Sequence, residues 1–279
     1  MRISVGQFGP TGRVEDNLVV VGRLAARAAR EGADLLVLPE ETMFTFRAVE
    51  GDFAGAVTGA WEPFTEGLAR LARHHGLAIV AGGYEPAVGD RPYNTLVAVD
   101  AEGAVIGAYR KLHLYDAFDH RESDLITPGD RGVVVVEVAG TRVGLQTCYD
   151  LRFPEVSRAL AAAGADVLAI PAAWFAGEHK VDHWRTLLRA RAVENTVWVA
   201  AADTRSEATV GHSAVIDPLA LTVAEHTDEA EALVTADVTR ERIDEVRAFL
   251  PVLANRRTDV FAVPLPSRDR HDDDAALNI

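Results

Sequence analysis

The stretch DLLVL, residues 34–38, is followed by Pro39 and indicates the fold of the chain more clearly than any other segment. A short, continuous apolar run that ends at a proline is typical of a strand buried on both faces. The run DVLAIP at 166–171 repeats this pattern in the second half of the chain. Strands of this kind need cover on both sides, so we expect helices to lie outside the sheets.

Predicted strands and helices alternate along the rest of the sequence. Apolar residues at helical spacing, and short apolar or alternating runs, define these segments. We predict helices at 16–31, 61–75, 154–163, 181–195 and 239–248, and strands at 2–8, 34–38, 77–83, 94–100, 104–110, 133–138, 142–148, 166–171, 196–203, 213–217 and 232–238. The fold class is therefore α/β, or a layered α+β arrangement. The two halves echo each other loosely, which favours two packed sheets built on one duplicated plan.

The sequence shows no linker rich in proline, glycine or serine. Residues 1–266 are therefore predicted to form a single domain. Within it, the three-residue connections 101–103 and 139–141 predict two β-hairpins. The polar, acidic segment 267–279 is predicted to be a C-terminal tail that is mobile or lies across a partner subunit.

The composition is that of an ordinary globular protein, with 279 residues of which 48% are hydrophobic. The formal charge is -14, from 28 basic and 42 acidic residues, which argues against nucleic acid and anionic membranes as partners.

No apolar stretch approaches the ~20 residues that span a bilayer, and the first ten residues lack the pattern of a signal peptide. The single cysteine excludes an internal disulfide and indicates a reducing, cytoplasmic setting.

Three polar side chains stand at the ends of predicted strands. Glu40 and Lys111 follow their strands, and Cys148 ends one. Ligands of open α/β sheets bind beyond the carboxyl ends of strands, so these side chains meet at one rim if the strands are neighbours and run the same way. Each also has an ordinary structural explanation: Glu40 as a solvated acid, Lys111 as a surface cation and Cys148 as a core residue. Together they supply a nucleophile, a base and an electrostatic stabiliser, which acyl transfer requires.

The surroundings of Cys148 strengthen the catalytic interpretation, because a thiol before a predicted helix and near a cation tends toward the reactive thiolate. A metal site is less well supported. His179 and His183 lie four residues apart in HKVDH, but this segment lacks the glutamate of zinc proteases. We interpret the two histidines as solvated or capping residues.

Seven segments occur in an order that matches a known family: LVLPEE (36–41), YRKLHLYD (109–116), RESDLITPGD (121–130), QTCYDLRFPE (146–155), HWRTLLRARAVEN (183–195), GHSAVIDP (211–218) and LPVLANRRTDVF (250–261). In these segments the sequence resembles the nitrilase superfamily of carbon–nitrogen hydrolases. The resemblance runs from residue 2 to about residue 263. It is strongest to the amidase branch that includes omega-amidases and deaminated-glutathione amidases.

The resemblance implies a four-layer α-β-β-α sandwich that forms homodimers or higher homo-oligomers. It also implies a Glu–Lys–Cys triad, in which the glutamate directly after the proline is Glu40 rather than Glu41. The lysine and the nucleophile match Lys111 and Cys148, and a second, assisting glutamate matches Glu122. The implied reaction is hydrolysis of a small linear amide through a cysteine thioester, releasing ammonia and a carboxylic acid, with no metal or organic cofactor.

The residues after the nucleophile favour an amidase over a nitrilase. True nitrilases usually carry Trp and then Glu there, whereas Tyr149 and Asp150 follow Cys148 in this chain. The backbone N–H of Tyr149 and the ammonium of Lys111 are the implied donors to the oxyanion of the reaction.

Other residues leave the substrate open. Arg152 matches a position where N-carbamoyl amino acid or beta-ureido acid amidohydrolases hold an arginine for a substrate carboxylate, and a structural arginine is the alternative. Trp174 and Phe175 follow the strand 166–171 and are predicted either to form a wall of the pocket or to pack in the core. We expect a small omega-amido acid, such as an alpha-keto acid amide, as the substrate. A degenerate scaffold protein is the alternative from another functional class.

Overall fold

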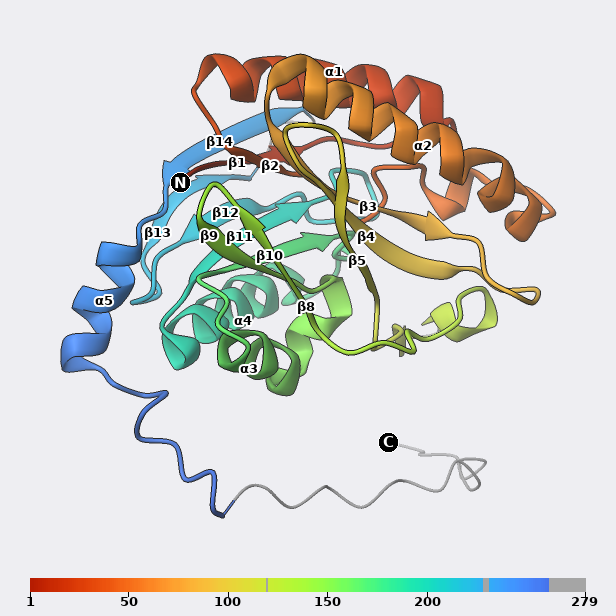
Figure 1. Cartoon of the computed structure of the whole chain (residues 1–279). Coiled ribbons are helices and arrows are strands. Elements are labelled where there is room, and N and C mark those ends of the chain that lie inside the picture. Colours follow the sequence, from red (N-terminus) through yellow and green to blue (C-terminus); the bar gives the residue numbers. More distant parts are fainter. Residues whose placement is uncertain (119, 228–230, 261–279) are drawn as a thin grey trace, which may run out of the picture.

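The computed structural model describes residues 1–118, 120–227 and 231–260, which contain two six-stranded sheets packed face to face (Figure 1). The first sheet contains β1 (Arg2–Gln7), β2 (Leu35–Val37), β3 (Ala78–Glu85), β4 (Tyr93–Val99), β5 (Val105–Arg110) and β14 (Ala232–Asp237). The second contains β8 (Val134–Val138), β9 (Thr141–Leu145), β10 (Val167–Ala172), β11 (Trp198–Asp203), β12 (Ser213–Ile216) and β13 (Thr222–His226). Their spatial orders are β14-β1-β2-β3-β4-β5 and β13-β12-β11-β10-β9-β8.

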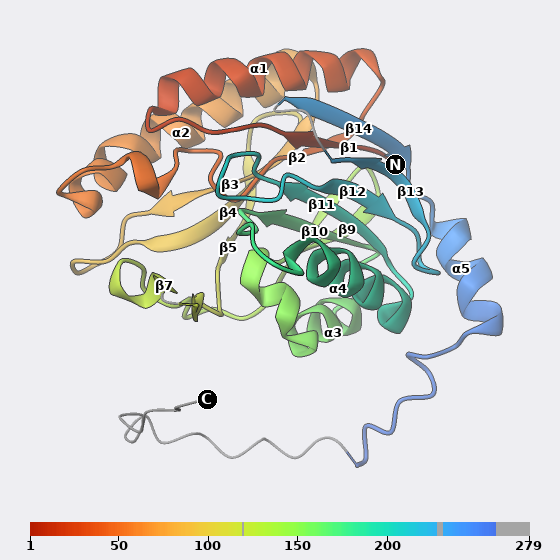
Figure 2. The ribbon, with the colours of Figure 1, turned by 180° about the vertical axis from the view of Figure 1, so that it is seen from behind.

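Helices cover the outer face of each sheet, which gives the molecule four layers (Figures 1 and 2). The helices α1 (Val14–Arg30) and α2 (Phe53–His75) pack on the first sheet, and α3 (Pro154–Ala162) and α4 (Lys180–Asn195) pack on the second. A further helix, α5 (Arg240–Phe249), follows β14. Short elements complete the described fold: η1 (Phe46–Ala48), β6 (Asp116–Ala117), β7 (His120–Arg121), η2 (Glu122–Asp124) and η3 (Cys148–Arg152). The predicted α-β-β-α sandwich is confirmed.

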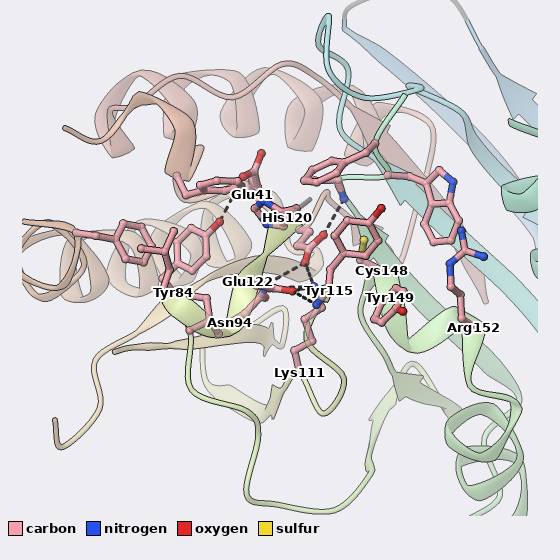
Figure 3. Close-up of a pocket in the computed structure, with 18 of the residues that line it drawn as sticks. Glu41, Tyr84, Asn94, Lys111, Tyr115, His120, Glu122, Cys148, Tyr149 and Arg152 are labelled. Carbon is pink, nitrogen blue, oxygen red and sulfur yellow. Dashed lines mark hydrogen bonds and ion pairs between the residues drawn. The ribbon is translucent and has the colours of Figure 1, made fainter. Parts of the chain in front are cut away.

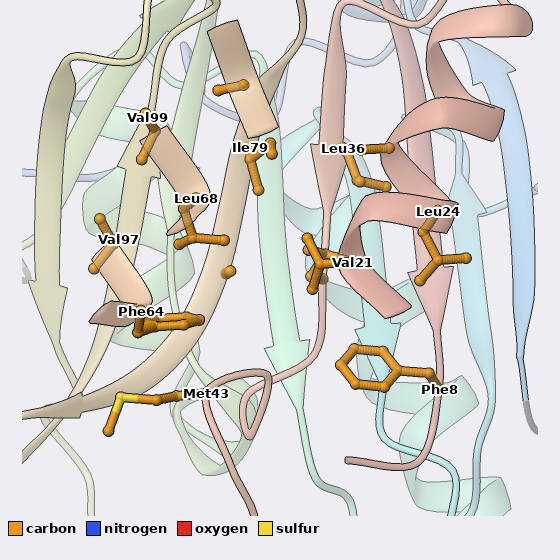
Figure 4. Close-up of a cluster of buried hydrophobic side chains, with 14 of the residues drawn as sticks. Phe8, Val21, Leu24, Leu36, Met43, Phe64, Leu68, Ile79, Val97 and Val99 are labelled. Atoms are coloured by element: carbon orange, nitrogen blue, oxygen red, sulfur yellow. The ribbon is translucent and has the colours of Figure 1, made fainter. Parts of the chain in front are cut away.

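The residues of β2 and its continuation alternate between two hydrophobic cores. Leu36 and Leu38 belong to the cluster that the first sheet forms with α1 and α2 (Figure 4), and Leu35 and Val37 belong to the cluster between the sheets. All four side chains are fully buried. The same alternation holds for β10, whose residues are shared between the central cluster and the cluster under α3 and α4. Both apolar runs are thus strands buried on both faces, as predicted.

The two sheets follow one plan. In the first, β14 is antiparallel to β1, then β1, β2 and β3 are parallel, and β4 and β5 are antiparallel additions. The second repeats this with β8, then β9, β10 and β11, then β12 and β13. This supports the duplicated plan, and it makes the end of β10 the counterpart of the end of β2. The two predicted hairpins are also confirmed, as β4–β5 and β8–β9.

Two of the longer elements differ most from the sequence prediction. Helix α2 begins at Phe53 rather than at residue 61, because the Asp52 side chain accepts a hydrogen bond from the Gly55 N–H and caps the helix. Two glycines and Pro63 weaken the helical pattern in these first turns. Strand β13 was not predicted, because it is largely exposed and lacks an apolar run. The predicted tail 267–279 lies outside the described residues, among which no helix is long and apolar enough to cross a membrane.

Candidate active site

The residues that follow β2, β5, β9 and β10 line one pocket (Figure 3). Glu40, Lys111 and Cys148 lie together in it, with 4%, 2% and 8% of their surface exposed. The pocket is also lined by Glu41, Phe46, Phe53, Tyr84, Asn94, Tyr115, His120, Glu122, Leu125, Ile126, Tyr149, Arg152, Ala173, Trp174, Phe175 and Lys180. All eight site residues predicted from the sequence therefore line the same pocket.

The three central side chains come together although their strands are not neighbours in one sheet. The sequence left open whether their strands are neighbours. In the structure, β3 and β4 separate β2 from β5, and β9 belongs to the other sheet. Face-to-face packing of the sheets brings the strand ends together instead. A direct link is the backbone N–H of Ala173, after β10, which donates to Glu40 Oε2 after β2 at 2.8 Å. The site therefore requires both sheets.

Lys111 joins two carboxylates. Its Nζ lies 2.8 Å from Glu40 Oε1, and 3.0 and 2.8 Å from the two carboxylate oxygens of Glu122. Asn94 Nδ2 donates to both acids, to Glu40 at 2.8 Å and to Glu122 at 3.2 Å. The backbone N–H of Tyr115 donates to Glu122 Oε2 at 2.6 Å. Each carboxylate thus has several donors, and the buried ion pairs have the hydrogen bonds that such pairs need.

These contacts fix the charges of the cluster. Burial alone would raise the pKa of Glu40, but the Lys111 ammonium and hydrogen bonds from its neighbours outweigh burial and lower it. Burial would lower the pKa of Lys111, but Glu122 and Glu40 hold it well above its usual value. The lysine is therefore protonated, as expected from its position between two glutamates, and Glu40 is ionised.

The position and charge state of Cys148 differ from expectation. Strand β9 ends at Leu145, and Cys148 is instead the first residue of η3, with a φ of +44°. A positive φ at a residue other than glycine is a strained conformation that is enriched at functional sites. Burial, and then the negative charge of Glu40, raise the pKa of the thiol well above its usual value. The resting thiol is therefore neutral, and not the thiolate we expected.

Asp150 connects the segment of Lys111 to the segment of Cys148. Its Oδ2 accepts hydrogen bonds from Tyr109 Oη at 2.7 Å and from the Thr147 N–H at 3.1 Å, and its Oδ1 accepts from the His113 N–H at 3.1 Å. Asp150 is fully buried. The sequence analysis did not assign it a role, because these contacts join distant parts of the chain.

Tyr149 contributes a backbone donor next to the thiol. Among the described residues, no hydrogen bond uses the Tyr149 N–H, which lies in the first turn of η3. A free N–H beside the nucleophile suits the stabilisation of an oxyanion. The ring of Tyr149 packs edge-on against the rings of Tyr115 and Phe153, at centroid distances of 4.9 and 5.3 Å.

Trp174 serves both purposes that the sequence left open. It lines the pocket, and it also packs on Trp184 at a centroid distance of 5.1 Å in the core of the second layer. The guanidinium of Arg152 lies over the Trp174 ring at 4.8 Å. Phe175 is partly buried and meets Tyr115 edge-on at 5.2 Å. Figure 3 shows Arg152 on one side of Cys148, with Tyr84 and Glu41 on the other.

Sequence reasoning missed four polar residues of the pocket and its surroundings, namely Asn94, Tyr115, Asp150 and Lys180. The available signal was weak: Asn94 is a polar residue near the start of an apolar strand, and Tyr115 lies within a family segment.

Among the described residues, no group of three or more His, Cys, Asp or Glu side chains could hold a metal ion. His179 and His183 are exposed at the start of α4.

Comparisons with known proteins agree with this geometry. The Carbon-nitrogen hydrolase family matches residues 2–248. The deaminated glutathione amidase of Escherichia coli O157:H7 is 39% identical over 275 residues, which are 95% of this chain and 99% of that relative. The NitN amidase from Nesterenkonia sp. AN1 is 29% identical, with a TM-score of 0.81 over 93% of this chain and 98% of that one.

A variant of the same Nesterenkonia amidase is modified at its own active-site cysteine. It carries a glutamate-to-glutamine substitution and shows covalent addition of the acetamide moiety of fluoroacetamide at the active-site cysteine. Its structure is 29% identical to this chain, with a TM-score of 0.78 over 93% of this chain and 95% of that one. The match over residues 2–248 and the shared fold show that the chain belongs to the carbon–nitrogen hydrolase family and is a hydrolase of carbon–nitrogen bonds.

Proposed function

We propose that this protein is an amidase, needing no cofactor, that cleaves a small linear amide through a thioester on Cys148. One observation carries the proposal. A neutral thiol, an ionised carboxylate on Glu40 and a buried ammonium on Lys111 converge in one pocket. Glu122 acts through Lys111, whose charge and position it maintains from 2.8 Å.

The first half of the reaction forms the thioester. Cys148 Sγ attacks the carbonyl carbon of the amide as Glu40 takes the thiol proton. The negative charge that develops on the carbonyl oxygen is stabilised by the Lys111 ammonium and the Tyr149 N–H, and one such donor typically contributes about 3 kcal/mol. Glu40 then gives its proton to the leaving nitrogen, the carbon–nitrogen bond breaks, and ammonia departs.

The second half releases the acid. Glu40 is ionised again and takes a proton from a water molecule, which attacks the thioester carbonyl. The same two donors stabilise the second oxyanion. Collapse of this intermediate breaks the carbon–sulfur bond, and the proton held by Glu40 returns to the thiol. The products are a carboxylic acid and the starting enzyme.

We propose an amide that carries a carboxylate, as in a small omega-amido acid, for the substrate. Two features support this choice. Arg152 lines the pocket without an ion-pair partner among the described residues, and a guanidinium is well suited to a carboxylate. The relatives include several deaminated glutathione amidases. Because Arg152 would serve an N-carbamoyl amino acid equally well, a carbamoyl amidohydrolase is the second candidate.

The assembly and compartment are part of the proposal. We infer a homodimer, as the family resemblance implies. We also infer a cytoplasmic location, because the sole cysteine is the proposed nucleophile and must remain a free thiol. Light scattering of the purified protein gives the assembly directly. A monomer at micromolar concentration would contradict the homodimer.

The test of the proposed function combines turnover with detection of the intermediate. Ammonia release is measured with small amides, carbamoyl amino acids and nitriles, and intact mass spectrometry of the rapidly quenched reaction detects the acyl-enzyme. We expect amides to be cleaved and the wild-type mass to increase by that of the acyl group. C148A should show neither turnover nor the adduct. Turnover by C148A, or a preference for nitriles, would refute the proposal.

A further inference from the structure

The use of lysine in this chain is unusual. Of the 28 lysines and arginines, 26 are arginines, and the two lysines are Lys111 and Lys180. Both line the same pocket and both are buried, with 2% and 8% of their surface exposed. Everywhere else, a cation of this chain is an arginine. Lys111 belongs to the proposed triad, whereas the mechanism leaves Lys180 without a role.

The ammonium of Lys180 lies among aromatic side chains. Its Nζ donates a hydrogen bond to Tyr115 Oη at 3.0 Å and lies 4.2 Å from the centre of the Phe118 ring. No carboxylate of the described residues lies within 4 Å of this nitrogen. An ammonium has three donors, so one hydrogen bond and a ring face satisfy it only in part. By contrast, Lys111 contacts two carboxylates.

A second cation, Arg152, also lines the pocket. The Arg152 guanidinium stacks on Trp174 at 4.8 Å, and it too forms no ion pair among the described residues. Trp174 contacts both residues, because its Nε1 also donates to the backbone carbonyl oxygen of Lys180 at 2.9 Å. One indole therefore contacts the guanidinium of Arg152 and the backbone of Lys180. Among the described residues neither cation has a counter-ion, in a chain with 42 acidic residues.

We propose that Lys180 is a specificity-determining residue that pairs with a carboxylate of the amide substrate. A buried charge without a partner is unfavourable, and a substrate carboxylate would supply the missing partner. The compact ammonium fits between Tyr115 and Phe118, where the larger planar guanidinium needs more room. This inference rests on the proposed function and assigns its substrate to the carboxylate-bearing amides.

The test compares an acid with its neutral isostere. The probes are glutaramate and glutaramide, and the variant is K180M, which keeps the packing of the side-chain stem and removes the charge. We expect the ratio of kcat/KM for glutaramate to that for glutaramide to fall 10- to 100-fold, through the KM for glutaramate. R185Q removes a cation that is also on α4 but does not line this pocket, and should keep the wild-type ratio. An equal decrease with both probes would overturn the inference.

A binding measurement separates this inference from the proposed reaction. Protein labelled with ¹³C at lysine Cε gives two lysine signals, because the chain has two lysines. K180M identifies the signal of Lys180. Glutarate should shift it, and sodium chloride at equal ionic strength should not. If the wild type hydrolyses neither amide, the proposed function fails and this titration alone decides the role of Lys180. No shift, or the same shift with chloride, would refute that role.

Discussion

At the residue scale, the surroundings of each charged group decide its role. Glu40 and Glu41 are adjacent and both are buried, yet their pKa values move in opposite directions. Glu40 has an ammonium at 2.8 Å, whereas Glu41 has the Tyr84 hydroxyl at 3.3 Å. Burial, and then the charge of Glu40, raise the pKa of Glu41 to about 7. Glu40, and not Glu41, is therefore the ionised carboxylate that the proposed base requires.

Glu41 should make the stability of the protein depend on pH. The pKa of Glu41 is 4.5 when exposed and about 7 in the fold. The contribution of Glu41 to the free energy of unfolding is therefore fully present below pH 4.5 and is lost as the pH rises through 7. The full loss is roughly 3 kcal/mol. E41Q mimics the protonated acid, so its free energy of unfolding should lack this decline. We expect urea unfolding at pH 5 and pH 8 to show wild type losing roughly 2 kcal/mol more than E41Q. Equal losses would contradict a raised pKa.

At the scale of elements, glycine in β3 allows the Glu40 loop to approach the sheet. A Cβ on Gly82 would lie 2.1 Å from the carbonyl oxygen of Glu40 and 2.5 Å from its Cα. The backbone of the loop is hydrogen-bonded there, with the Gly82 N–H donating to the Pro39 carbonyl oxygen at 3.1 Å. Close approach of the two backbones, and not a positive φ, therefore requires glycine at this position.

G82A should displace Glu40 from the thiol. We expect kcat to fall about 100-fold or more, because small misplacements of a catalytic group are costly, and stability to decrease by about 1–3 kcal/mol. G132A is the matched control, since a Cβ there meets nothing within 4 Å. Its kcat should be that of the wild type, and its stability should change by less than about 0.5 kcal/mol. Kinetics and thermal unfolding check both variants. Wild-type kcat in G82A would show that the loop tolerates the methyl group.

Predictions from sequence succeeded where the signal was local. The run 34–38 alternates between two cores, and its apolar composition alone indicates this. The motif PEE placed Glu40 at the strand end. Long-range contacts could not be predicted from the sequence. Asp150 binds His113 and Tyr109, which are 37 and 41 residues away in sequence, and no local pattern encodes such contacts. The charge state of Cys148 was also predicted wrongly, because burial against Glu40 outweighs the neighbouring ammonium.

At the scale of the whole molecule, the site depends on a duplicated architecture. The first sheet supplies the proposed base and ammonium, and the second supplies the proposed nucleophile through η3. Figure 2 shows that the two sheets share one central interface, flanked by helices on both sides. Neither half of the chain holds the complete triad. Catalysis is therefore expected to require the intact sandwich, with a proton passing from a residue of one sheet to a residue of the other.

The rate of thioester formation in E40Q tests this proton transfer most directly. Single-turnover reactions of wild type and E40Q with an amide that the wild type cleaves are quenched over time, and intact mass spectrometry measures the acylated fraction at pH 7. Glutamine cannot accept the proton of a thiol whose pKa is raised, so E40Q should acylate about 1,000-fold more slowly than the wild type. Acylation of E40Q within a few-fold of the wild-type rate would contradict the account, because Cys148 would then lose its proton without Glu40.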